Sequence, residues 1–502
     1  MIPQLENPTS PASRRLRALV PTLVFLGMVV AVVSSLGAPL IPAIAAMYGV
    51  TLGDAQWSLT ITLLVGALAT PTMGRLGDGP RRRQVILGAL GAVVAGSALA
   101  ALPWGFAALI AGRALQGLGI GLTPLAMATA RSALPHDRSR SAVALLSITT
   151  VAGVGLGYPI TGLIAQELGL HAGFWFGAIV SGAALIAAMI VLPEPAARQT
   201  SRLDFVSALL LGAALASLLL AITQGERWGW TSWRLVALAA TSVLLFIAWV
   251  YHELRTPHPL VDLRLVRDRS VLTADVTALF AGVGMYLLLA TVVRYVQTPA
   301  SAGYGFGASI VVAGLVLLPF SASSVAASRV GPYIARRTSA ELVLPIGCVI
   351  FVVAMLTFAE ARGALWQVFV AMAIAGLGVS CTFAAMPALI VRAVPVHETG
   401  SAMSFNLVLR YIGYSTGSAL SAAILDTHTP PGRTLPLESG YDAIAWTGCA
   451  LWAISAAVSF VLPRTRTVAP VDEVLAEESI ADAIPSDEDA EDAGAARPID
   501  RH

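Results

Sequence analysis

The sequence carries one pattern of glycines and prolines twice. In the first copy Gly117-Leu118-Gly119 precedes Pro135, Gly153 and Gly157, and in the second Gly376-Leu377-Gly378 precedes Pro395, Gly413 and Gly417. The copies are 376 − 117 = 259 residues apart at their start and 417 − 157 = 260 apart at their end. Each copy lies in two long apolar runs joined by a short polar loop. Two homologous halves in such an apolar chain indicate a secondary transporter.

The apolar runs decide the fold class. Of the 502 residues 56% are hydrophobic and only 12% are charged, and uncharged runs of about 20 residues can cross about 30 Å of hydrocarbon as helices. The alternating pattern of membrane-spanning strands does not appear. Because lipid offers no hydrogen bonds to the backbone, we expect an all-α membrane protein.

Fourteen apolar runs are expected to be transmembrane helices. They cover approximately residues 18–45, 55–74, 84–102, 106–130, 141–166, 172–193, 203–224, 233–252, 271–297, 305–328, 341–360, 365–391, 400–426 and 441–463. An even number of spans places both termini on one side of the membrane. Most loop arginines lie on that same side, so the positive-inside rule predicts that both termini are cytoplasmic.

The repeat predicts how the chain is divided. Two pseudo-symmetric six-helix bundles, residues 18–193 and 271–463, are expected to flank two inserted helices, residues 203–252. A cytoplasmic N-terminal segment (1–17) and a cytoplasmic linker (253–270) complete this plan. Residues 464–502 are acidic and poor in aromatics, so we expect a disordered cytoplasmic tail.

Several function classes are excluded by what the sequence lacks. All 31 basic residues are arginines, and without lysine no Gly-x-x-x-x-Gly-Lys loop can bind ATP, so the chain itself is not an ATP-driven pump. Metal-ligand spacings and nucleophilic triads are missing as well. We therefore expect no enzyme, no metal site and no cofactor. The three cysteines lie in apolar runs and are interpreted as core residues.

Further motifs lie in and between the predicted spans. They are Gly74-Arg75-Leu76-Gly77-Asp78-Gly79-Pro80-Arg81-Arg82-Arg83 after span 2, Arg113 to Gly119 in span 4, Gly153 to Gly162 in span 5, Glu253 with Pro259-Leu260-Val261-Asp262-Leu263 before span 9 and Arg410-Tyr411-Ile412-Gly413 in span 13. Together they make residues 18–463 resemble the major facilitator superfamily, specifically its fourteen-span drug:proton antiporter branch.

The loop after span 2 is the most specific of these motifs. Gly74 and Gly77 are expected to permit a tight reversal, and Asp78 to pair with Arg75 or Arg81 or to meet a helix N-terminus. The resemblance implies that this cluster, with Arg82, latches one conformation and releases it in the other. A basic turn that only fixes topology is the alternative. The family has glycine where Arg81 stands.

Span 4 contains a charge that lipid would exclude. An arginine at the bilayer centre costs about 2.5–3.5 kcal/mol on insertion scales, so Arg113 is expected to face a cavity or polar partners. The resemblance makes Arg113, together with Gln116, part of the substrate or proton path. A structural arginine satisfied by carbonyl groups is the alternative.

Span 5 has a nearly smooth face. Gly153 and Gly157 permit close helix contact, and Pro159 predicts a kink. The resemblance associates this stretch with exchange rather than uptake, whereas close packing alone would also explain it.

The remaining candidates are isolated charges in or near the spans. Arg294 is expected to pair with Glu167, Glu360 or Asp426, or to snorkel toward the interface, and Arg410 is expected to be buried. The branch usually carries an aspartate in span 1, but residues 32–39 contain none. Asp275 and Glu167 are therefore the candidates for proton coupling, although a solvated helix start would explain Asp275 more simply.

These observations predict a secondary active transporter in a bacterial plasma membrane. It would export drug-like or amphipathic small molecules by alternating access with proton antiport. Its partners would be the small-molecule substrate, protons and membrane lipids, and no nucleic acid. A facilitator of lipids or anions is one alternative, because the cavity lacks the span 1 acid. A non-transporting membrane sensor or scaffold is the other.

Overall fold

The computed structural model describes residues 11–36, 40–50, 52–193, 204–229, 232–257, 259–339, 342–430 and 435–461. Within these ranges the regular structure is helical and contains no strand. The α-helices are α1 (Pro11–Ser35), α2 (Ile41–Tyr48), α3 (Leu52–Gly77), α4 (Arg82–Ala101), α5 (Phe106–Gly117), α6 (Leu122–Ala133), α7 (His136–Leu168), α8 (Leu170–Val191), α9 (Phe205–Trp228), α10 (Trp233–Arg255), α11 (Arg269–Gln297), α12 (Ile310–Leu315), α13 (Leu318–Arg337), α14 (Val343–Glu360), α15 (Leu365–Ala393), α16 (Thr399–Thr427) and α17 (Glu438–Val461). The predicted tail, residues 464–502, and most of the segment 1–17 lie outside the described residues.

Each of the fourteen predicted runs falls in a helix, but three runs are interrupted. The first run is divided between α1 and the short helix α2, whose first turn carries a proline. The fourth run is α5 and α6 joined by the 3-10 turn η2 (Leu118–Gly121), and the tenth is α12 and α13, where Pro319 opens the second helix. Proline cannot donate a backbone hydrogen bond, which explains why two of these breaks fall beside one.

Eleven helices of the described chain are long and apolar enough to cross a membrane. The all-α membrane fold is thus confirmed, whereas the count of fourteen spans stays a prediction. α7 and α16 are not among the eleven, and in α1 the apolar stretch Ala18–Val33 is shorter. α16 is rich in serine, threonine, asparagine and glycine, many of them buried against other helices rather than lipid. Hydropathy is a weak signal for such interior helices.

The repeated glycines pack equivalent helices against one another. A Cβ atom on Gly117 would lie 2.5 Å from the Thr62 carbonyl of α3, and one on the matching Gly376 would lie 2.0 Å from the Phe320 carbonyl of α13. α3 and α13 hold the predicted second and tenth spans, which are equivalent in the two halves. The repeated glycines Gly117 and Gly376 therefore lie at equivalent helix contacts in the two halves.

The second pair of repeated glycines follows the same rule. A Cβ atom on Gly153 of α7 would lie 2.5 Å from Ala31 Cβ of α1, and one on Gly413 of α16 would lie 2.5 Å from the Leu279 carbonyl of α11. Small residues at these crossings allow the backbones to approach closely. The first and fifth helices of each half are thus held together in the same way.

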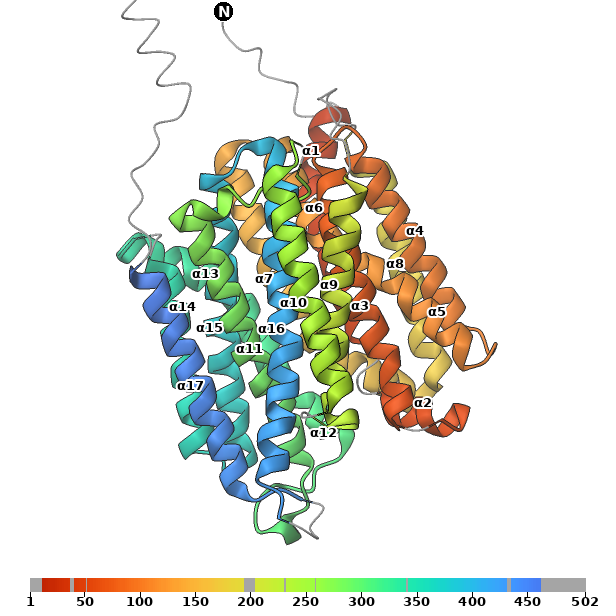
Figure 1. The fold of residues 1–502 in the computed structure, drawn as a ribbon, viewed down its shortest axis with the longest axis vertical. Helices are drawn as coiled ribbons and strands as arrows, with labels where there is room; N and C mark the ends of the chain where they lie inside the picture. Colours follow the sequence, from red (N-terminus) through yellow and green to blue (C-terminus); the bar gives the residue numbers. More distant parts are fainter. Residues whose placement is uncertain are drawn as a thin grey trace, which may run out of the picture. The chain divides into compact units, whose positions relative to one another are not determined.

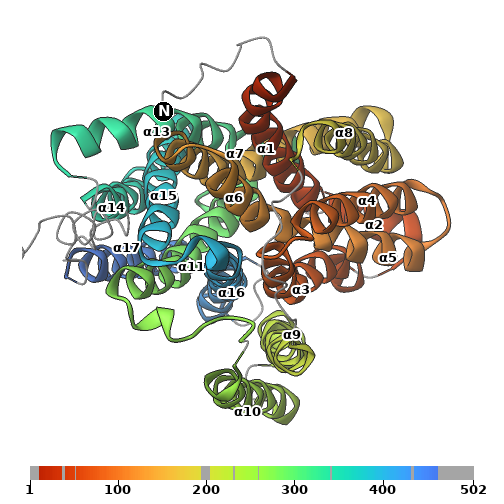
Figure 2. The same cartoon turned by 90° about the horizontal axis from the view of Figure 1, so that it is seen from above.

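The two halves lie side by side along two contact lines. α3 and α6 pack against α16, and α7 packs against α13 and α15. The red-to-yellow helices of the first half and the green-to-blue helices of the second are separated in Figure 2 along these lines. Helix α9, which belongs to the predicted insertion, contacts both α3 and α16 and covers their junction, with α10 outside it (Figures 1 and 2).

Candidate gating and coupling site

Asp78 joins the two halves at one end of the bundle. It lies in the turn after α3, and its carboxylate accepts hydrogen bonds from the backbone N–H groups of Gly400 (2.6 Å) and Ser401 (2.9 Å) and from Ser401 Oγ (2.8 Å). Both N–H groups belong to the first turn of α16, where free donors and the helix dipole favour an anion. Of the partners that the sequence left open, the structure thus includes a helix N-terminus. We call Asp78, Gly400 and Ser401 the latch, and this end of the bundle the latch face.

Gly74 permits the latch to close, but not by the expected route. The sequence predicted that Gly74 and Gly77 allow a tight reversal, yet both lie in helix α3 and neither has a positive φ angle. A Cβ atom on Gly74 would instead lie 2.1 Å from Ser404 Oγ and 2.8 Å from the Gly400 carbonyl. Glycine is required here because α3 and α16 cross at close range.

The buried latch carboxylate has an unusual proton affinity. Asp78 is 6% exposed, and burial raises its pKa to about 6, against the opposing effect of the hydrogen bonds from Ser401 and Gly400 and of the charge on Arg82. Desolvation disfavours the carboxylate more than its hydrogen bonds stabilise it. The pKa of the latch carboxyl therefore lies well above the 3.8 of an ordinary aspartate.

The three arginines after Asp78 do not share one role. Arg82 is buried and donates to the carbonyl groups of Gly77 (2.5 Å) and Ala128 (3.1 Å) and to Ser132 Oγ (2.6 Å). It ties the latch turn to α6 within the first half. Arg81, which stands where the family has glycine, is exposed at the N-terminus of α4.

Arg131 is a second bridge between the halves, which the sequence analysis missed. Its guanidinium extends from the end of α6 and donates to Thr399 Oγ1 (2.5 Å) and to the carbonyl groups of Val391 (2.5 Å) and Val394 (2.8 Å). These carbonyls terminate α15, where a cation is favoured. Arginines are common in such loops, so only the neighbouring helix end distinguishes Arg131.

Arg113 lies inside the first half, fully buried. Its guanidinium donates to the carbonyl groups of Ser58 (2.8 Å) and Val33 (3.2 Å) and to Gln116 Oε1 (2.6 Å), and Gln116 in turn donates to Ser97 Oγ (2.8 Å). This is the geometry of the structural alternative, an arginine satisfied by carbonyl groups. A role for Arg113 and Gln116 in the substrate or proton path stays a prediction.

The glycines of span 5 serve close packing in this structure. Gly153 contacts α1 as described above, and Gly157 is buried. α7 runs without interruption past Pro159, whose side chain lies outside the described residues. The kink and the role in exchange stay predictions.

Asp275 is not at a solvated helix start. It is 4% exposed, and its Oδ1 accepts a hydrogen bond from Asn406 Nδ2 of α16 (2.9 Å). The simpler interpretation of the sequence is therefore wrong, because the linker before α11 and helix α16 cover this turn. Asn406 was missed, since an asparagine in an apolar run gives little signal without its partner.

Arg410 continues this polar chain. It is 3% exposed, as expected for a buried role, and donates from Nη2 to Asn406 Oδ1 (3.2 Å). Its guanidinium carbon lies 4.2 Å from the centre of the Phe383 ring, a cation–π contact. Asn406 thus connects a buried carboxyl group on α11 with a buried guanidinium on α16. We call Asp275, Asn406 and Arg410 the coupling chain.

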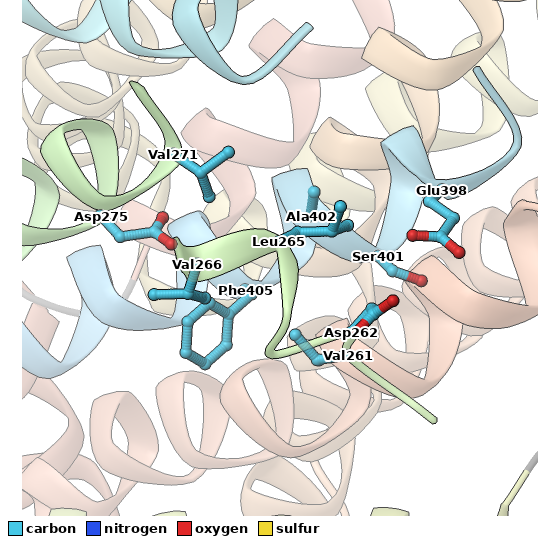
Figure 3. A pocket seen from close by; sticks show the side chains of 10 residues that line it. All are labelled: Val261, Asp262, Leu265, Val266, Val271, Asp275, Glu398, Ser401, Ala402 and Phe405. Carbon is cyan, nitrogen blue, oxygen red and sulfur yellow. The ribbon is translucent and has the colours of Figure 1, made fainter. Parts of the chain in front are cut away.

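A small cavity lies between the latch and the coupling chain. Its volume is about 10 Å³, close to what one water molecule needs. Figure 3 shows Asp275 at one end and Glu398 at the other, with Ser401 of the latch in the wall. Ser401 of the latch and Asn406, which binds Asp275, therefore both lie in the first turns of α16.

Arg294 lies at the opposite end of the bundle, which we call the far face. It is exposed and lines a cavity of about 590 Å³ with Gln297, Asp426 and Tyr441. Among the described residues its expected ion pairs with Glu167, Glu360 or Asp426 do not form. Glu167 is exposed near the end of α7, so the structure does not bring it to the coupling chain.

The comparisons with known proteins agree with this architecture. The sequence profile of the Major Facilitator Superfamily matches residues 23–418 and, in a second match, residues 276–482. The chain belongs to this superfamily. It is therefore a multi-pass membrane transporter of that superfamily, as expected. Membership in the fourteen-span branch stays a prediction.

Bacterial relatives include proteins of drug resistance and export. The multidrug resistance protein B homolog of Mycobacterium tuberculosis is 30% identical over 394 residues, covering 75% of this chain and 70% of the relative. The tetracenomycin C resistance and export protein of Streptomyces glaucescens is 26% identical over 402 residues, covering 79% and 74%. In both cases the alignment covers most of the length of the relative.

One solved structure of similar fold is the crystal structure of the human organic anion transporter MFSD10 (TETRAN). It matches with a TM-score of 0.63 and 18% identity, covering 88% of this chain and 99% of that protein. At this identity the likeness supports the fold alone.

Proposed function

We propose that the chain exports drug-like or amphipathic small molecules in exchange for protons, with Asp275 as the proton-binding carboxylate. Relatives named for multidrug resistance and for export favour this class of cargo and this direction. Glu167, the other predicted carboxylate, is exposed near the end of α7, whereas Asp275 is buried and bound to Asn406.

The observation that carries the proposal is the contact of Asp275 with α16, the helix that the latch also holds. Its hydrogen-bond partner Asn406 and the latch residue Ser401 both lie in the first turns of α16. A buried carboxylate inside a membrane protein is costly when ionised, so its charge state depends on its neighbours. Gain or loss of a proton at Asp275 changes its hydrogen bond to Asn406. It therefore changes the free energy of the contact between α11 and α16, the helix that the latch also holds.

In this conformation the latch face is closed by Asp78 and Arg131. We propose that this face is cytoplasmic and that residues 18–193 and 271–463 move as two bundles about the site, with residues 203–252 inserted between them. Release of α16 by Asp78 and of α15 by Arg131 would open the latch face for cargo to enter. Support comes from the arginine-rich loops at this face and from the repeated glycine contacts.

Transport by purified protein in liposomes tests the proposal. With an imposed pH gradient and ethidium as the probe, we expect Asp275→Asn to lower gradient-driven transport at least tenfold. Exchange of ethidium for ethidium without a gradient should persist, because it needs no net proton movement. The matched control is Asp426→Asn on the far face, which should transport normally.

The alternatives give different results in the same assay. Unchanged gradient-driven transport in Asp275→Asn would refute the proposed proton site. Movement of carboxyfluorescein but not ethidium, independent of the gradient, would favour an anion facilitator. Absence of transport for every probe in protein that folds would favour a sensor or scaffold.

A further inference from the structure

The linker between α10 and α11 is an ordered part of the latch face. Leu260 and Val261 are 1% and 3% exposed although neither lies in a helix. The segment continues through the 3-10 turn η3 (Leu265–Arg267), and Asp268 then caps α11 by accepting a hydrogen bond from the Ser270 N–H (2.7 Å). Residues 259–268, which we call the lid, are therefore held at both ends.

One buried carboxylate on an inserted helix holds the start of the lid. Glu253, in the last turn of α10, is 2% exposed, and its Oε1 accepts a hydrogen bond from the Val261 N–H (2.5 Å). Its other oxygen accepts from Ser207 Oγ of α9, which also accepts a hydrogen bond from Trp249 Nε1 (3.0 Å). Apolar contacts among Leu211, Trp249, Leu260, Val261 and Val408 surround this network. Glu253 thus fixes the lid to the inserted helices and α16.

The lid forms one wall of the small cavity that Asp275 lines. Val261, Asp262, Leu265 and Val266 line one side of the small cavity, and α11, α16 and Glu398 just before α16 supply the rest of it (Figure 3). With room for about one water molecule, the cavity is too small for bulk solvent. Movement of the lid would open it to solution.

We propose that the lid controls access of water and protons to Asp275, and that Glu253 is the positioning residue that keeps the lid in place. The inserted helices would then take part in the transport cycle by holding the lid in place. The proposal rests on the proposed role of Asp275, but the position of the lid is testable by itself. The charged and titratable groups on the lid are Asp262, Arg264, Arg267 and Asp268. Those beside it are Glu253 on α10, Glu398 before α16, and the pair of Asp204, which caps α9, with His252 on α10 (2.7 Å).

Cysteine accessibility tests the lid directly. Ala402 lines the cavity from α16 and is 9% exposed. In a chain whose native Cys348, Cys381 and Cys449 are replaced by alanine, Ala402→Cys in nanodiscs is treated with a charged methanethiosulfonate reagent. We expect slow modification, which Glu253→Ala accelerates at least tenfold because the Val261 N–H loses its acceptor.

Two further variants separate positioning from simple destabilisation. Glu253→Gln keeps an oxygen for the Val261 N–H and an amide that can donate to Ser207, so its modification rate should stay within about twofold of the parent. Ser207→Ala disturbs the same network but leaves the Glu253–Val261 bond, and should also leave the rate nearly unchanged. In both variants, transport should follow the pH profile of the parent. In Glu253→Ala, by contrast, transport should no longer depend on the imposed pH gradient.

An unchanged modification rate in folded Glu253→Ala would overturn the proposal. If that variant does not fold, Val261→Pro removes the donor while leaving the inserted helices intact, and an unchanged rate there would have the same meaning. Failure of the proton site itself is distinguishable. In that case Asp275→Asn transports normally, while Glu253→Ala still exposes the cysteine at position 402.

Discussion

At the scale of single residues, the sequence identified Asp78 and Gly74 but not their partners. The acid in a basic loop was recognisable, and a helix N-terminus was among the partners considered. Gly74 was assigned to a turn because glycine in a loop motif usually indicates one. Its actual contact is with Ser404, more than three hundred residues further along the chain. No local pattern predicts such a crossing.

Gly74→Ala should weaken the closed latch. The added Cβ atom would lie 2.8 Å from the Gly400 carbonyl, which is backbone and cannot rotate away. Overpacking of this kind costs about 1–3 kcal/mol, so we expect a loss of transport of about fivefold or more with normal expression. Gly88→Ala in α4, where nothing lies within 4 Å of the new atom, is the control. Equal transport in the two variants would refute the crossing.

Acidification should strengthen the latch through Asp78. Its pKa is about 6 in the latched state, against 3.8 for an ordinary aspartate. The state with the higher pKa binds the proton more tightly, so it gains stability as the pH falls below about 6. Between pH 7 and pH 5 the latched state should gain about tenfold over the open one.

Spin labels at Arg138→Cys and Arg392→Cys, exposed on either half near the latch face, measure this by electron spin resonance distances. The short-distance population should grow on acidification, in a chain without the native cysteines. Asp78→Asn should remove the pH response. A response that survives this substitution would assign it to another group.

At the scale of helices, apolar runs predicted where the elements lie, and the glycine repeat predicted that their packing is repeated. The coupling chain could not be predicted in the same way. Asp275 and Asn406 are 131 residues apart, and each is ordinary until α11 and α16 are placed together. Burial of Asp275 also involves the lid, which the sequence predicted as part of a cytoplasmic linker that carries a motif but not as a wall beside Asp275.

The crossing of α11 and α16 should be sensitive to side-chain size. A Cβ atom on Gly417 would lie 2.1 Å from the Val283 carbonyl. We expect Gly417→Ala to lower the unfolding temperature of the detergent-purified protein by several degrees, since overpacking costs about 1–3 kcal/mol. Gly182→Ala in α8, with open space around it, should not lower it. Identical unfolding temperatures would argue against close backbone contact at Gly417.

At the scale of the whole molecule, the first half holds one segment of the second half from two sides. Arg131 binds the end of α15, and Asp78 binds the start of α16, so residues 391–401 are fixed to the first half. The sequence supplied the transporter class and the motif, but this geometry follows only from how the two halves meet.

Arg131→Ala should therefore open the latch face without damage to either half. Four hydrogen bonds to the second half are lost, the one to the Pro395 carbonyl being the longest at 3.5 Å, and hydrogen bonds to charged groups contribute about 1.5–3 kcal/mol each. The same pair of spin labels should show a longer distance, with an unchanged unfolding temperature. Arg81→Ala, which removes an exposed arginine nearby, is the control. A distance that matches the parent would contradict a bridging role for Arg131.

The inserted hairpin spans a junction that must part in every cycle. Helix α9 of this hairpin contacts both α3 and α16. Glu253 on α10, however, binds Val261 of the lid, which packs with Val408 of α16, so the hairpin is attached to the second half. When the halves separate, α9 is expected to leave α3, and acyl chains must then fill the uncovered strip. The turnover rate should consequently vary with bilayer thickness and fluidity, even for cargo that never dissolves in lipid.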